Sequence, residues 1–89
     1  MEQVSNDKMW DKMEKHGAPC AIKLLCNLKK TYTGAGKEYV PLGHITNQNR
    51  PIQLEEIKRG KNHVLWGRLK SGEGWIELTD VQLYEANQS

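Results

Sequence analysis

From Cys20 onward the chain alternates apolar and polar residues with a period of two, which is the pattern of a β-strand with one buried face. The segment CAIKLLCNLKK predicts one strand over 20–30, with an inner face of Cys20, Ile22, Leu24, Cys26 and Leu28. Further short apolar runs follow at 52–57, 63–69, 75–78 and 79–84. Because glycine-containing turns such as KRGKN and KSGEG separate these runs, we expect a mainly β fold. Its expected form is a small barrel of five or so short antiparallel strands.

The first part of the chain has a different pattern and predicts one N-terminal α-helix over 5–16. Ser5 is a good N-cap, Gly17 suits the position just after the helix, and Pro19 stops its continuation. We therefore expect a helix and linker over 1–18, followed by a barrel over 19–89 in a single compact domain.

The helix carries one narrow apolar stripe, formed by Met9, Trp10 and Met13. A helix of about twelve residues is marginal on its own, so it is expected to dock against another surface. That surface is either the outer side of the domain's own first strand, at Ala21 and Leu25, or a partner protein.

Length and composition limit the possible classes. The chain has 89 residues, of which 37% are hydrophobic and 27% charged, which suits one small globular domain. The net charge of +2 is a mild bias, weaker than that of a dedicated nucleic-acid binder. Neither a transmembrane run nor a secretion signal is recognisable, so a cytoplasmic protein is expected.

The two cysteines, Cys20 and Cys26, are expected to be reduced and to behave as small buried hydrophobic residues. On one extended strand they would lie roughly 20 Å apart, far beyond disulfide reach. Two other interpretations stay open: metal ligation together with His16 or His63, and a catalytic Cys–His pair. No CxxC or HxxxH spacing supports the metal site.

The segment LWGRLKSGEGWIEL over 65–78 resembles the C-terminal hairpin of bacterial SH3-like (SH3b) domains, accessory modules of Firmicute and phage cell-wall hydrolases. Upstream, CNLKKTYTGAGKEYVPLGHI is similar to the first-loop segment of the same family, with Asn27, Lys29, Tyr39 and Gly43 at matching positions. The resemblance covers about residues 20–84. It implies an SH3-like barrel without catalytic activity.

In that family, ligands lie in a groove beside the long first loop, and they are often peptides of the peptidoglycan stem or cross-bridge. The resemblance places Tyr32 and Tyr39 on the loop and Trp66 and Trp75 on the hairpin as ligand-binding candidates. Aromatic rings suit an extended peptide because they bury its surface at little entropic cost. For each ring the alternative role is packing in the barrel core or at its corner.

Basic residues gather near the loops and form a possible contact surface. They are Lys29, Lys30, Lys37, Arg50, Lys58, Arg59 and Lys61. Such a surface could bind single-stranded nucleic acid, an acidic protein or an anionic nucleotide, or it could be an ordinary solvated surface.

Enzymatic patterns are weak. Glu55 and Glu56 are adjacent and point to opposite faces of a strand, and the TGAG segment lacks the residues of a phosphate-binding loop. We therefore expect no catalysis, no cofactor and no metal.

The favoured function is recognition of a protein or peptide. A freestanding cytosolic phage or mobile-element protein that inhibits a host defence enzyme is an alternative. Peptidoglycan binding and single-stranded nucleic-acid binding are the others.

Overall fold

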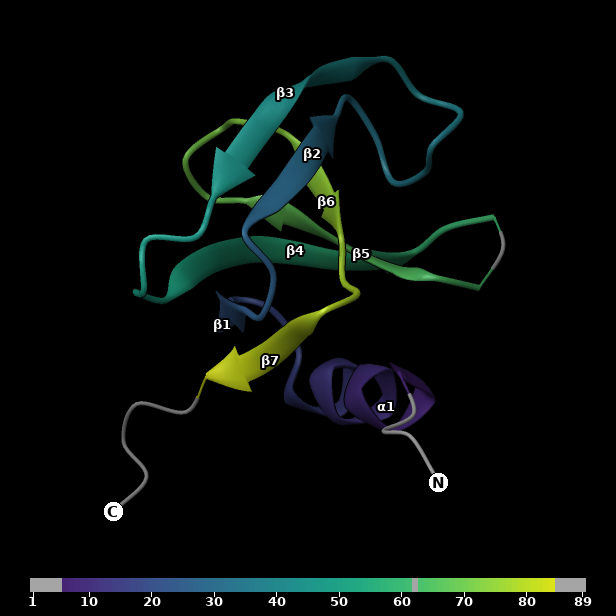
Figure 1. Ribbon diagram of the computed structural model, residues 1–89. Helices are drawn as coiled ribbons and strands as arrows, with labels where there is room; N and C mark the ends of the chain where they lie inside the picture. The colour runs from purple at the N-terminus through teal and green to yellow at the C-terminus, as the bar shows by residue number, and fades with distance from the viewer. Residues whose placement is uncertain (1–5, 62, 85–89) are drawn as a thin grey trace, which may run out of the picture.

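The computed structural model describes residues 6–61 and 63–84 (Figure 1). Its elements are α1 (Asn6–His16), β1 (Cys20–Leu24), β2 (Leu28–Tyr32), β3 (Pro41–Thr46), β4 (Ile52–Arg59), β5 (Leu65–Leu69), β6 (Trp75–Glu77) and β7 (Val81–Tyr84). The predicted mainly β class and the single N-terminal helix are confirmed. The described residues form seven strands rather than about five, and they contain no helix long and apolar enough to cross a membrane.

All seven strands belong to one antiparallel sheet in the order β3-β2-β6-β5-β4-β1-β7. β1 and β2 are consecutive in the chain but lie four inter-strand spacings apart in the sheet. A flat sheet would separate them by about 19 Å, whereas the chain from Leu24 to Leu28 can span at most about 14 Å. The sheet must therefore curl, which encloses its inner face.

That inner face and the helix share one hydrophobic cluster. Its buried members are Trp10, Met13, Cys20, Ile22, Leu24, Leu54, Leu65, Leu69, Ile76, Leu78, Val81 and Leu83. Most alternate along their strands, as the period-two pattern predicts.

The continuous strand expected over 20–30 is wrong, because the chain bends at 25–27 between β1 and β2. The amide of Asn47 holds this bend, since its Nδ2 donates to the carbonyls of Leu24 and Cys26 at 3.1 Å each. The bend changes the face of the residues that follow. Leu28, expected inside, is 48% exposed.

The segment over 30–43 contributes to a hairpin. β2 pairs with β3 from Leu28↔Thr46 to Tyr32↔Pro41, with an irregularity between Thr31 and Tyr32. The loop 33–40 joins the two strands.

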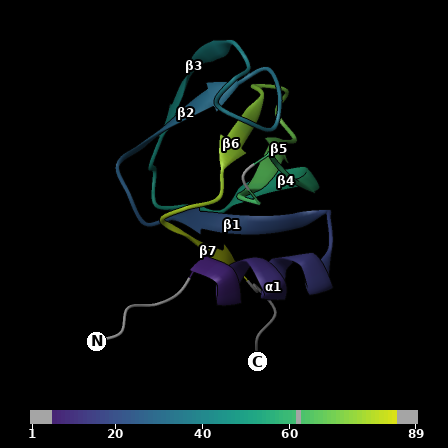
Figure 2. The ribbon, with the colours of Figure 1, turned by 90° about the vertical axis from the view of Figure 1, so that its right-hand side faces the viewer.

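Helix α1 docks on the sheet and lies along β7, on the side away from the β2–β3 hairpin (Figures 1 and 2). Met13 is fully buried, and the indole Nε1 of Trp10 donates to the carbonyl of Leu78 at 2.6 Å. Docking at Leu25 is wrong, because that side chain is 63% exposed. The expected N-cap, Ser5, lies outside the described residues.

The end of the helix follows the sequence pattern. Gly17 has a positive φ of 78°, and its N–H donates to the carbonyl of Met13 at 2.8 Å. A second link joins the helix to β4. Arg59 donates from Nε and Nη2 to the two carboxylate oxygens of Glu14, both at 3.0 Å, and its guanidinium lies 5.5 Å from the Trp10 ring centroid.

Candidate functional site

Three of the four predicted aromatic residues lie together on the outer face of the sheet. Tyr32 on β2 is directly opposite Trp75 on β6, and Trp75 is opposite Arg68 on β5. Because side chains alternate along a strand, Trp66, two residues before Arg68, points to the same side. Leu65, Leu69 and Ile76 point to the other side and enter the core.

Trp66 supports this face rather than forming its surface, since it is only 3% exposed. The ring of Tyr32 meets it edge to face, with centroids 5.5 Å apart and planes at 88°. The loop 33–40 covers it from another side. A methyl group added at Gly60 would lie 2.8 Å from the carbonyl oxygen of Ala35 and 3.0 Å from the indole, which shows how closely these segments pack. Trp66 lines a pocket of about 120 Å³ together with residues of the loop.

Tyr32 and Trp75 stay half-buried and are accessible from solvent. An exposed leucine, Leu42 on β3, lies nearby: its Cδ1 is 2.9 Å from the position that a Cβ on Gly74, the residue before Trp75, would take. We call Tyr32, Leu42 and Trp75 the aromatic face. Gly74 has a φ of 118°. Because glycine has no side chain, the carbonyl oxygen of Tyr32 can approach it closely, to 2.6 Å from where a Cβ on Gly74 would lie.

Tyr39, the fourth predicted aromatic residue, lies on the loop. It is 44% exposed and its ring rests against Gly34, where a Cβ would be 2.6 Å from Tyr39 Cδ1. A side chain at position 34 would displace the Tyr39 ring from this position. The next residue, Val40, is 65% exposed, so the loop ends in an apolar surface.

Two basic residues beside the aromatic face, Arg68 and Lys37, are paired with acidic residues. Arg68 lies with its guanidinium carbon 5.9 Å from the Trp75 ring centroid and makes ion pairs with Glu55 at 2.9 Å and Glu56 at 3.4 Å. Lys37 of the loop pairs with Glu77 at 3.6 Å.

Lys30, two residues before Tyr32 on β2, is exposed on the same face of the sheet, as is Lys58, directly opposite Trp66 on β4. Neither lysine makes an ion pair among the described residues, so a ligand there meets uncompensated positive charge.

The predicted basic surface is only partly available. Lys29 is buried, its Nζ donates to Thr79 Oγ1 at 2.8 Å, and burial lowers the pKa of its ammonium group. Arg59 binds the helix, as described above. Lys29, expected at the surface, is therefore buried, whereas Arg59 is held against the helix with 32% of its side chain exposed. The exposed members are Lys30, Lys37, Arg50, Lys58 and Lys61.

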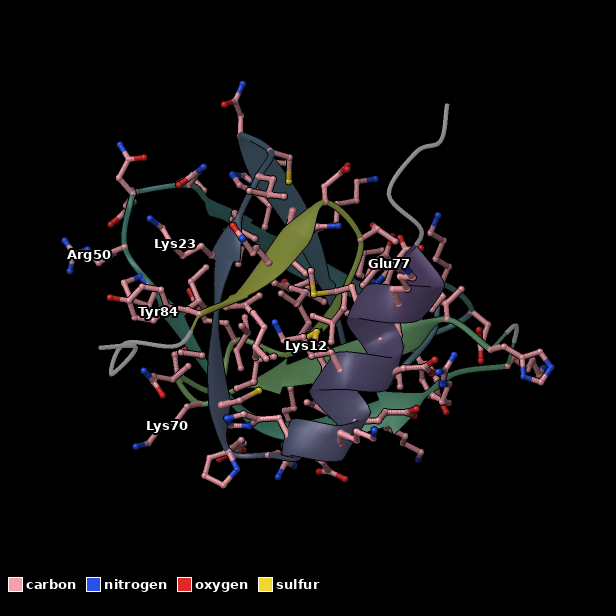
Figure 3. The ribbon with its side chains drawn as sticks, turned by 90° about the horizontal axis from the view of Figure 1, so that it is seen from below. Lys12, Lys23, Arg50, Lys70, Glu77 and Tyr84 are labelled. Carbon is pink, nitrogen blue, oxygen red and sulfur yellow. The ribbon has the colours of Figure 1, made fainter. Side chains whose placement is uncertain are left out.

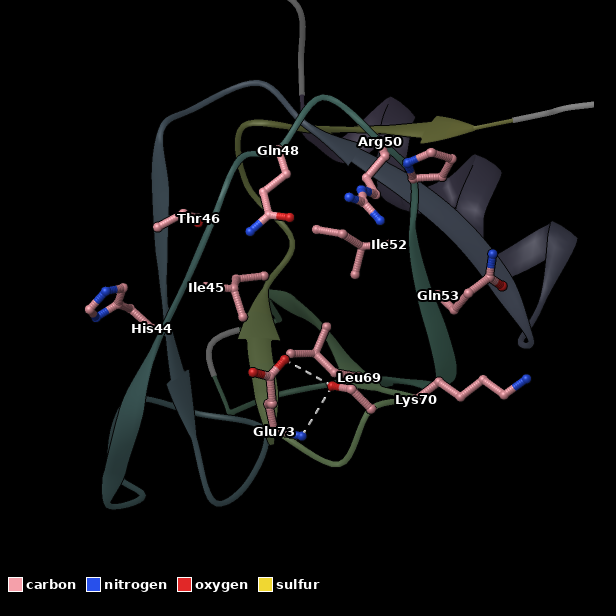
Figure 4. A pocket seen from close by; sticks show the side chains of 12 residues that line it. His44, Ile45, Thr46, Gln48, Arg50, Ile52, Gln53, Leu69, Lys70 and Glu73 are labelled. Atoms are coloured by element: carbon pink, nitrogen blue, oxygen red, sulfur yellow. Dashed lines mark hydrogen bonds between the residues drawn. The ribbon is translucent and has the colours of Figure 1, made fainter.

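A larger concavity lies elsewhere, and the sequence pattern did not predict it. A pocket of about 640 Å³ opens between the end of β3, the connection to β4 and the β5–β6 turn (Figure 4). Its apolar side chains come from Ile45, Pro51, Ile52 and Leu69. Polar side chains from Arg50, Gln48 and Lys70 stand around them. The signal in the sequence is the polar segment TNQNRP over 46–51, which supplies Thr46, Gln48, Arg50 and Pro51 to the lining.

Neither cysteine belongs to a group that could hold a metal ion in the described part of the chain. Cys20 and Cys26 are free thiols, and burial raises the pKa of Cys20. Cys26 Sγ contacts the carbonyl oxygen of Leu28 at 3.5 Å. Among residues 6–61 and 63–84, no three His, Cys, Asp or Glu side chains gather where they could hold a metal ion.

Comparison with known proteins adds no relative to this picture. No family model matches the chain, and neither a curated protein nor a solved structure does.

Proposed function

We propose that this chain is a non-catalytic binding module with an SH3-like barrel, and that it recognises a protein or peptide through the aromatic face beside its long first loop. The observation that carries the proposal is the directly opposed pair Tyr32 and Trp75, half-exposed on the rigid outer face of the sheet. The resemblance of 65–78 to bacterial SH3-like hairpins and the curled antiparallel sheet both support the barrel.

The aromatic face suits an extended peptide for a physical reason. Rigid aromatic rings present large apolar surfaces and lose little side-chain entropy when a ligand covers them. The buried indole of Trp66 braces Tyr32 from below, so the ring is held in place before binding. Arg68 is already paired with two glutamates, so the charges of this face that remain available to a peptide are those of Lys30 and Lys58.

Purified Gram-positive sacculi are the first probe, because their stem and cross-bridge peptides are the ligands implied by the resemblance. We expect the protein to co-sediment with them, and Tyr32→Ala and Trp75→Ala each to weaken binding by about five- to thirtyfold. Tyr84→Ala is the matched control, since Tyr84 is an aromatic residue of β7 with 36% exposure. Circular dichroism checks that each variant is folded.

Capture from a bacterial lysate tests the alternative that the ligand is a cytosolic protein. A partner bound through the aromatic face must be lost from Trp75→Ala and kept by Tyr84→Ala. Wild-type binding retained by both aromatic-face variants, with sacculi and with any captured partner, would exclude this face as the binding site.

A further inference from the structure

β3 lies at one end of the sheet, so its edge away from β2 has no strand partner among the described residues. Antiparallel pairing assigns the groups on that edge. Asn47 N–H donates to the carbonyl of Asn27 at 2.9 Å, and hydrogen-bonded pairs recur every second residue, at Ile45↔Lys29 and Gly43↔Thr31. The N–H and C=O groups of His44 and Thr46 therefore point outward.

The same stretch of β3 borders the pocket of about 640 Å³, whose lining includes His44, Ile45 and Thr46. Figure 4 shows the side chain of Ile45 pointing into the pocket and that of His44 pointing away. Ile52 and Leu69 complete the apolar floor. A strand added along this edge would place the side chain opposite Ile45 over that floor, because directly opposed residues share a face.

The charge of the pocket defines the chemistry of its occupant. Arg50 and Lys70 are exposed and make no ion pair within the described part of the chain. Both project from the same margin of the molecule (Figure 3), and they stand toward different ends of the pocket (Figure 4). The one carboxylate of the lining, Glu73, accepts a hydrogen bond from Ser71 Oγ at 2.9 Å.

We propose that the free edge of β3 binds an extended acidic peptide by strand addition. The peptide pairs its main chain with His44 and Thr46 and places an apolar side chain over Ile45. Residues two positions before and after lie about 7 Å away on the same face, and acidic side chains there reach Arg50 and Lys70. This site shares no residue with the aromatic face, so it does not depend on the proposed function.

The test uses the full chain and two synthetic pentapeptides. The acidic probe is acetyl-Glu-Thr-Val-Thr-Glu-amide, whose central valine and two glutamates share one face. The basic control is acetyl-Lys-Thr-Val-Thr-Lys-amide. Amide chemical shifts and hydrogen exchange are followed by NMR during titration. We expect the acidic peptide to protect the His44 and Thr46 amides and the basic peptide to leave them unprotected.

Variants separate the main-chain and charge contributions. His44→Pro removes an N–H group that points away from β2, and an edge strand tolerates proline at such a position. This variant should not bind the acidic peptide. His44→Ala keeps that N–H and should bind normally. Arg50→Glu should weaken binding by at least about tenfold. Lys8→Glu makes the same charge change on an exposed helix position and should have little effect.

Three results would overturn the proposal. The first is the absence of any shift at β3 with the acidic peptide at millimolar concentration. The second is a peptide response without the expected selectivity: either the basic peptide binds as well as the acidic one, or the amide chemical shifts change only at Tyr32 and Trp75. The third is protection of His44 and Thr46 without peptide that grows with protein concentration, because the edge then pairs with a second copy of the chain. A thermal melt shows whether His44→Pro is folded, and Arg50→Glu tests the site independently.

Discussion

Trp10 offers the sharpest test of how the helix is held. Its indole N–H donates to the carbonyl of Leu78 at 2.6 Å in a buried setting. Leu78 is fully buried, and its own N–H is engaged by the carbonyl of Leu65 at 2.9 Å. Trp10→Phe keeps an aromatic ring at this position but removes the donor. The carbonyl of Leu78 then has no ready access to water.

The expected loss of stability has two parts. Leaving a buried carbonyl without a donor costs about 1–3 kcal/mol. The smaller ring loses roughly 1 kcal/mol of apolar burial. The free energy of unfolding should therefore fall by about 2–4 kcal/mol, out of the roughly 5–13 kcal/mol expected for a chain of 89 residues. The melting temperature should fall by at least about 8 °C.

Urea unfolding followed by far-UV circular dichroism measures this difference. Trp75→Phe is the matched control, because Trp75 is half-buried and its indole makes no hydrogen bond to another described residue. The control should change stability by less than about 1 kcal/mol. If Trp10→Phe loses no more than Trp75→Phe, the helix is not anchored by this hydrogen bond, and the alternative of a partner-binding helix gains support.

Three further outcomes can be measured on the same chain. Gly74→Ala should destabilise the fold more than Gly72→Ala in thermal melts, because both have positive φ but only the Gly74 site has backbone within 2.6 Å of the new Cβ; equal losses would contradict the close approach. Burial lowers the pKa of the Lys29 ammonium group in the folded chain below its usual value of 10.5. Between these two pKa values the unfolded chain binds more protons than the folded chain, so the free energy of unfolding should rise with pH over that range. Lys29→Met should abolish this increase in the free energy of unfolding, measured by urea unfolding at several alkaline pH values. An increase of unchanged size in the variant would show that another group causes it. Cys26 should react with a thiol reagent faster than Cys20, whose thiol is buried with a raised pKa, and the reverse order by mass spectrometry would place Cys20 at the surface.

The candidate site could be predicted in part. The alternation in 65–78 is enough to place Trp66 and Trp75 on adjacent antiparallel strands, and the structure has both on the outer face. The alternation does not predict that Trp66 is buried while Trp75 remains partly exposed. Trp66 is covered because the loop 33–40 folds over it, and a loop's path depends on contacts distant in the sequence.

The larger pocket could not be predicted for a similar reason. Its lining joins the end of β3, the connection to β4 and the β5–β6 turn, which are far apart in the chain. β3 itself carries Pro41 and Gly43, and most of its side chains are exposed, so it has no buried alternation to detect. Its pairing with β2 is decided by the hairpin as a whole.

The amino-acid sequence by itself determined the mainly β class, the N-terminal helix with its end at Gly17, and the inward face of the first strand at Cys20, Ile22 and Leu24. These properties follow from local periodicity and capping, which operate over a few neighbouring residues. Only the tertiary structure decided the bend at 25–27, the burial of Lys29 and the cover over Trp66. Each depends on a contact with a distant segment, from Asn47, Thr79 and the loop 33–40 respectively, and local pattern carries no information about such contacts.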